Sequence, residues 1–153
     1  MSLFTQPYHD AVAQLTEPGA PFEVINCSIE GLSLKAFSQA HSSLSDYLNG
    51  GRQHGDKLLL QYQESTWSFK EFYTAADRLS HWLVTEGNIT AGTPVAIAMR
   101  NRPEWLIAFV AIINVGGIAV PLNSWGKSAD LEQGLEDSHA ALLICDAPRW
   151  KYV

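Results

Sequence analysis

The sequence has little cysteine, no evident secretion signal and no basic stripe. Its 153 residues include only Cys27 and Cys145, which lie far apart, so the dense disulfide framework of small secreted proteins is excluded. The N-terminus lacks a positively charged start followed by an apolar core, and we therefore expect a cytoplasmic protein. Lysine and arginine total 10 against 16 acidic residues, which gives a net charge of −6. This balance argues against nucleic acid and against an anionic membrane surface as partners.

Sequence motifs that hold phosphate, metal or a catalytic nucleophile are absent as well. There is no G-x-x-x-x-G-K-[ST] loop and no G-x-G-x-x-G segment after a predicted strand. Asp137-Ser138-His139 contains the letters of a hydrolase triad, but adjacent residues rarely align as a triad, so we interpret the segment as a helix end. No histidine has metal-ligand spacing with a cysteine or carboxylate: His9, His41, His54, His81 and His139. From these residues we predict no catalytic, cofactor-binding or metal-binding site.

The uncharged stretch from Trp105 to Gly126 is about as long as a helix that crosses a bilayer. Signals for a helix start precede it, because Asn101 is a preferred N-cap, Pro103 is tolerated in the first turn and Glu104 completes a capping box. Gly116-Gly117 can adopt the left-handed conformation that ends a helix. The resulting helix is too short for a bilayer, and we therefore predict no transmembrane segment.

The clearest helix start is Ser68-Phe69-Lys70-Glu71, a full S-x-x-E capping box. Trp67 and Phe72 can form the hydrophobic staple around it. From there apolar residues recur at three- and four-residue spacing, which predicts one wide buried stripe: Phe69, Phe72, Tyr73, Ala76, Leu79, Trp82 and Leu83. Gly87 is expected to end this helix.

Predicted helices and strands alternate through the rest of the sequence. Apolar runs at 95–99, 118–122 and 140–145 are typical of buried strands, with helices between them, the last near 129–138. A predicted hairpin over 58–67 precedes them. Alternation of this kind indicates right-handed βαβ crossovers and a mostly parallel sheet, whose ligands bind beyond the carboxyl ends of the strands. Those ends carry Arg100-Asn101, Asn123-Ser124 and Asp146.

We divide the chain into an extended N-terminal arm, residues 1–42, and an incomplete α/β subdomain, residues 43–153. Pro18-Gly19-Ala20-Pro21 interrupts any long element in the arm, although Tyr8 to Leu15 can form a short helix. The predicted fold class is α/β, a mostly parallel sheet with βαβ crossovers plus an N-terminal arm and a β-hairpin. A half-built parallel sheet exposes an edge and apolar surface, so we expect the isolated chain to self-associate.

Three segments resemble the adenylate-forming (AMP-binding) enzyme superfamily. They are T-W-S-F-K-E-F at 66–72, the segment G-T-P-V-A-I-A-M-R-N-R-P-E-W that continues from Gly92 to Ser124, and L-E-Q-G-L-E-D-S-H-A-A-L-L-I-C-D at 131–146. Their order and spacing are similar to those of the family, and their character is nearest to fatty-acid and other acyl-CoA ligases. The segment over 10–48 also fits that group.

This resemblance implies an enzyme that activates a carboxylate, such as a fatty acid, with ATP and Mg²⁺. The products are an acyl-adenylate and pyrophosphate, and coenzyme A then displaces AMP to form a thioester. In the family the Ser/Thr/Gly-rich phosphate loop, the adenylate-binding motifs and the catalytic lysine follow the part matched here. The resemblance therefore implies no catalytic residue in this chain, which would act with the rest of a parent polypeptide.

Some relatives approach the CoA nucleotide with basic residues near the helix expected at 129–138. Gly134 and Leu135 stand where those residues are expected, so the resemblance fails at that point. Lys127 is the nearest basic residue, and the resemblance gives it no established role.

The leading hypothesis is the N-terminal piece of an ATP-dependent acyl-CoA ligase, inactive by itself. One alternative is a free-standing flavodoxin-like binding or interaction module. Another is a non-CoA member of the superfamily, such as a peptide-synthetase adenylation domain or a luciferase-like oxidase. An in-frame continuation past Val153 with a Ser/Thr/Gly-rich loop favours the ligase, and a stop codon favours the module. The family's acyl pocket is formed largely by later sequence, so the acyl-chain length cannot be read here.

Overall fold

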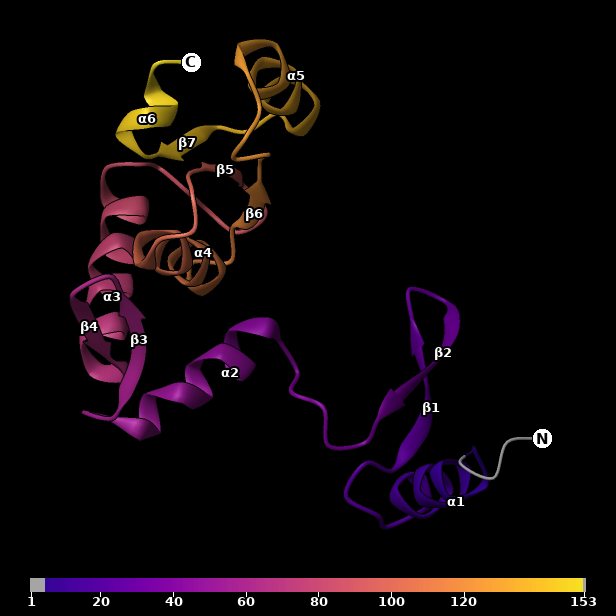
Figure 1. Cartoon of the computed structure of the whole chain (residues 1–153). Coiled ribbons are helices and arrows are strands. Elements are labelled where there is room, and N and C mark those ends of the chain that lie inside the picture. The colour runs from indigo at the N-terminus through magenta and orange to yellow at the C-terminus, as the bar shows by residue number, and fades with distance from the viewer. Residues whose placement is uncertain (1–4, 153) are drawn as a thin grey trace. The chain divides into compact units, whose positions relative to one another are not determined.

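A computed structural model describes residues 5–152 of the chain (Figure 1). Contacts between residues divide the chain after Ser42 into two compact units, Met1–Ser42 and Ser43–Val153. We treat each unit as a separate body.

The first unit contains a helix and a β-hairpin. Helix α1, Thr5–Thr16, covers the short helix predicted from Tyr8 to Leu15. Strands β1, Val24–Ile29, and β2, Leu32–Phe37, pair antiparallel. The turn residues Glu30 and Gly31 have φ values of 51° and 82°, as a two-residue type I′ hairpin requires. The segment expected as an extended arm thus contains a regular hairpin over residues 24–37, because two strand-forming runs meet at a turn that glycine permits.

The second unit begins with short elements and continues as alternating helices and strands. In chain order these are α2 Leu44–Asn49, the 3₁₀ helix η1 Gly50–His54, β3 Leu58–Tyr62, β4 Ser65–Ser68, α3 Phe69–Thr85, β5 Pro94–Ala98, α4 Pro103–Asn114, β6 Ile118–Pro121, α5 Ser128–Ser138, β7 Leu142–Cys145 and α6 Ala147–Trp150. The antiparallel pair β3–β4 confirms the predicted hairpin.

Strands β5, β6 and β7 form a three-stranded parallel sheet in the order β6-β5-β7. Ala96 pairs with Val120 of β6 on one side and with Leu143 of β7 on the other. The connection from β5 to β6 runs toward one edge of the sheet, and the connection from β6 to β7 runs back across β5 to the other edge. Right-handed crossovers in opposite directions place their helices, α4 and α5, on opposite faces of the sheet, as Figure 1 shows. The predicted βαβ crossovers are confirmed, but only this sheet is parallel, since both hairpins are antiparallel pairs.

The core of the second unit surrounds β5. One buried cluster joins β5 and the residue after it to α4. It includes Val95, Ile97 and Met99 on one side and Ala108 and Ile112 of α4 on the other. Every residue of this strand from Val95 to Ala98 has no exposed surface. The other two strands are edges of the sheet.

Strand β6 corrects the expectation of a buried strand at 118–122. Ile118 is 52% exposed, and none of the four residues of β6 is fully buried. A strand buried on both faces needs a neighbour on each side and a helix on each face, which here only β5 has.

Helix α3 begins as predicted. The Glu71 backbone N–H donates to the Ser68 hydroxyl at 3.2 Å, and the Ser68 N–H donates to the Glu71 carboxylate at 2.8 Å, which completes the capping box. Phe72 and Leu83 of the predicted stripe are buried, but Trp82 is 45% exposed, so its assignment to the core is wrong. The stripe is narrower than predicted because α4 covers only part of the α3 surface.

Helix α4 begins at Pro103, one residue later than a cap at Asn101 requires. The N-cap is Arg102, whose side chain makes no capping hydrogen bond and instead pairs with Glu104 at 3.1 Å. The helix ends at Asn114, and Gly116 follows with φ of 75°. Residues 105–126 are therefore a helix, a glycine corner and a strand, as predicted. Within residues 5–152, no helix combines the length and the apolar character that a membrane crossing needs.

Candidate functional site

The carboxyl ends of the three parallel strands meet at one edge of the sheet, where open α/β sheets bind ligands. The loops that leave this edge begin at Met99, Leu122 and Asp146. Asp146 is buried and caps α6, since its carboxylate accepts the Arg149 N–H at 3.0 Å. The same carboxylate accepts the Arg100 N–H at 3.4 Å. The loops after β5 and β7 are thus joined by one buried carboxylate.

Arg149 joins the loop after β6 to this arrangement. Its side chain is buried, and its Nη1 donates to the Ser124 carbonyl at 2.5 Å and to the Gly126 carbonyl at 3.5 Å. Its Nε has no hydrogen-bond partner in the structure. The guanidinium lies over the Tyr152 ring, 5.2 Å from the ring centroid. A buried arginine that binds two loop carbonyls fixes the position of residues 124–126.

An exposed tryptophan lies at the same edge. Trp125 is 77% exposed, and the Arg100 guanidinium lies 5.4 Å from its ring centroid. The Asn123 side-chain oxygen accepts the Trp125 N–H at 3.0 Å, which closes the loop after β6. The sequence-predicted edge residues Arg100, Ser124 and Asp146 therefore come together through hydrogen bonds, whereas Asn123 serves its own loop.

Sequence reasoning missed Arg149 and Trp125. The spacing of Asp146, Pro148 and Arg149 is a helix-start signal that could have placed α6, since Asp is a preferred N-cap and Pro is tolerated in the first turn. The burial of Arg149 has no signal in the local sequence, because it depends on the carbonyls of a loop more than 20 residues earlier.

Gly134 of α5 lies where some relatives of the family have basic residues near CoA, and its close packing explains why it is a glycine. A Cβ added at Gly134 would lie 2.9 Å from Cδ2 of Leu122, so Leu122 would have to move before a basic side chain could stand there. Leu135 is half-buried and Lys127 is exposed. Lys127 is the N-cap residue of α5, and its backbone N–H donates to the Asp130 carboxylate at 2.9 Å.

The three residues that spell a hydrolase triad, Asp137, Ser138 and His139, each have a structural role at the end of α5. The Ser138 hydroxyl donates to the Gly134 carbonyl at 2.7 Å, and the Asp137 carboxylate accepts from Gln133 at 2.7 Å. His139 is the exposed left-handed residue that ends α5, with φ of 50°. These contacts confirm the interpretation as a helix end. Among residues 5–152 there is no group of three or more metal-ligating side chains.

Cys145 is the last residue of β7, at the carboxyl edge of the sheet. Burial raises its pKa, and the neighbouring Asp146 carboxylate raises it further. A thiol with a raised pKa is mostly protonated at neutral pH and is a poor nucleophile. The raised pKa therefore argues against a nucleophilic role for Cys145.

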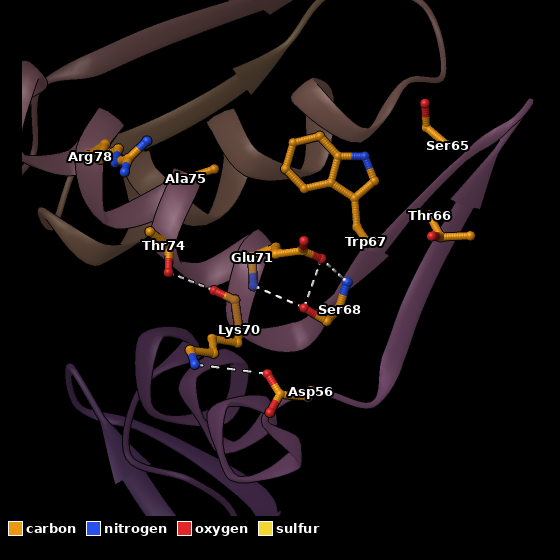
Figure 2. Close-up of a pocket in the computed structure, with 10 residues that line it drawn as sticks. All are labelled: Asp56, Ser65, Thr66, Trp67, Ser68, Lys70, Glu71, Thr74, Ala75 and Arg78. Carbon is orange, nitrogen blue, oxygen red and sulfur yellow. Dashed lines mark hydrogen bonds and ion pairs between the residues drawn. The ribbon is translucent and has the colours of Figure 1, made fainter.

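Two hollows lie beside the β3–β4 hairpin. The larger, of about 920 Å³, is lined mostly by polar residues, some of which bind one another (Figure 2). Ser68 and Glu71 form the capping box there, and the Lys70 ammonium lies 3.9 Å from the Asp56 carboxylate. The smaller, of about 320 Å³, is mostly apolar and adjoins the loop after β5: Leu60, Gln61, Tyr62, Asn101, Arg102, Pro103, Trp105 and Leu106. In the larger hollow the Ser68 hydroxyl donates to the Glu71 carboxylate at 2.8 Å, and this contact belongs to the capping box of α3.

The sequence matches one enzyme family over most of the second unit. Residues 49–152 match the family described as AMP-binding enzyme. The chain is 33% identical over 89 residues to malpinin synthetase from Mortierella alpina, which covers 58% of this chain and 1% of that protein. It is 30% identical over 105 residues to the very long-chain fatty acid transport protein of Saccharomyces cerevisiae, which covers 62% of this chain and 16% of that protein.

Solved structures show the same fold. An N-terminal subdomain of Klebsiella oxytoca NpsA bound to anthranilyl-AMSN superposes with a TM-score of 0.65 at 21% identity, over 72% of this chain and 28% of that one. O-succinylbenzoate coenzyme A synthetase from Bacillus subtilis, in complex with AMP, superposes with a TM-score of 0.61 at 26% identity, over 69% of this chain and 28% of that one. The chain thus spans less than a third of the length of each of these relatives.

Proposed function

Because the chain belongs to the AMP-binding enzyme family, we propose that it forms the first part of the N-terminal domain of a carboxylate-activating ligase. The reaction proposed for the parent protein joins a carboxylate to ATP to give an acyl-adenylate and pyrophosphate. Coenzyme A then displaces AMP to give an acyl-CoA. Mg²⁺ is proposed to accompany ATP, in keeping with a Bacillus subtilis synthetase structure that contains both.

The observation that carries this proposal is the parallel sheet β6-β5-β7 with its crossover helices. It lies entirely within the matched residues 49–152, and it accounts for the order and spacing that resemble the family. Arg149 and Asp146 hold the loops at its carboxyl edge. We propose that this part is a wall that positions later catalytic loops.

The residues described here do not fit a nucleotide phosphate or a metal ion. Helix N-termini bind phosphate through free N–H groups. At α3 and α5, a carboxylate of the chain itself accepts the N–H of the residue that precedes the helix: Glu71 accepts from Ser68, and Asp130 accepts from Lys127. No cluster of three metal-ligating side chains occurs within residues 5–152. We therefore assign ATP, Mg²⁺ and CoA to the parent protein and derive no catalytic step from this chain.

Coenzyme A as the acceptor is the finer part of the proposal. The Bacillus subtilis relative is named as a coenzyme A synthetase and is 26% identical, against 21% for the Klebsiella oxytoca structure. The alternative is a non-CoA adenylating domain, which the family relationship supports equally, since a relative 24% identical over 139 residues is named N-(5-amino-5-carboxypentanoyl)-L-cysteinyl-D-valine synthase. A fatty acid is the proposed carboxylate in the first case.

The direct test begins with the gene. We expect the reading frame to continue past the codon for Val153 into a Ser/Thr/Gly-rich loop, and the longer product to exchange pyrophosphate with ATP when a fatty acid is present. Thioester formation with CoA supports the ligase, and exchange without thioester supports the non-CoA alternative. A stop codon directly after Val153, or no exchange with any carboxylate, contradicts the proposal.

The 153-residue chain itself is predicted to be inactive. Incubation with a fatty acid, ATP and Mg²⁺ should release no more pyrophosphate than a blank without protein. Release above the blank would contradict the role of a non-catalytic wall. The predicted cytoplasmic location and the self-association of the isolated chain stay predictions at this point.

A further inference from the structure

We draw no further inference here: the strongest candidate, the mostly apolar hollow of about 320 Å³ between strand β3 and the start of helix α4, carries no proposal because nothing in the structure of residues 5–152 shows what covers it.

Discussion

Strand β5 and the β1–β2 hairpin are both rich in strand-forming residues, but they differ in how far these residues are buried. Val95 to Ala98 of β5 have no exposed surface, whereas no residue of the hairpin is fully buried. In β5 the stability comes from apolar burial between two strands and two helices, with Val95 and Ile97 packed against α4. In the hairpin it comes from cross-strand hydrogen bonds and a turn that requires left-handed residues. The first arrangement identifies a core, and the second is a pair of strands in which no residue is fully buried.

The largest expected effect removes side-chain volume from β5. Ile97→Ala should lower the free energy of unfolding of the second unit by about 2–5 kcal/mol, because it leaves a cavity among residues that cannot collapse. The control is Ile29→Ala in the hairpin, which should cost less than about 0.5 kcal/mol at a concentration where the chain is monomeric. Urea unfolding followed by fluorescence measures both. Similar losses at the two positions would remove the distinction between core and surface.

The next effect concerns the loops at the carboxyl edge of the sheet. Arg149→Met should cost about 1–3 kcal/mol, since the buried carbonyls of Ser124 and Gly126 lose their donor. Arg149→Lys should recover part of the loss, because an ammonium can still donate to one carbonyl. Hydrogen exchange should accelerate at residues 124–127 and stay unchanged in β5. Uniform acceleration through β5 would show that Arg149 supports the whole sheet and not the loop.

The hairpin can be altered without touching β5. Gly31→Ala places a Cβ at φ of 82°, which should cost about 1–2 kcal/mol within the hairpin. Glu30→Asn is the matched substitution of opposite sign, because asparagine tolerates the left-handed conformation better than glutamate. Hydrogen exchange in β1 and β2 should rise with the first change and fall with the second. The thermal midpoint of the second unit should not move in either variant.

The smallest effect concerns a surface ion pair. A bidentate hydrogen bond from Arg52, at 2.6 and 2.9 Å, lowers the pKa of Asp77. A carboxyl whose folded-state pKa is depressed stabilises the fold above its unfolded pKa, about 3.9, and this contribution is lost as the pH falls below that value. Asp77→Asn should therefore cost less than about 1 kcal/mol at pH 7 and should reduce the loss of stability below pH 4. Thermal unfolding from pH 3 to pH 7 measures both, and an unchanged acid slope would contradict the pairing.

The sequence predicted the second unit better than the first. The capping box at Ser68 and the glycine corner at Gly116 are local signals, and the structure confirms both. The alternation of strands and helices predicted parallel crossovers, because few chain paths satisfy that order. The exposure of side chains was predicted less well. The sequence does not show that β6 is an edge strand, and it does not show that Trp82 lies outside the contact between α3 and α4.

The hairpin was missed although its signal is present. The runs Val24–Ile29 and Leu32–Phe37 flank Glu30-Gly31, but the Pro18–Pro21 segment before them suggested an irregular arm. At the candidate site, Arg100, Ser124 and Asp146 were predicted from topology alone. The role of Arg149 could not be predicted, because it depends on a contact between loops that no local sequence pattern encodes.

The strand order β6-β5-β7 is the basis of the fold and of the proposed role as a wall, and backbone NMR tests it most directly. The account predicts parallel cross-strand contacts from β5 to both neighbours, with Ala96 beside Val120 on one side and Leu143 on the other. It also predicts that the amides of Val95 to Ala98 exchange only through unfolding of the whole second unit. Antiparallel contacts, or fast exchange in β5 while the hairpin is protected, would contradict it.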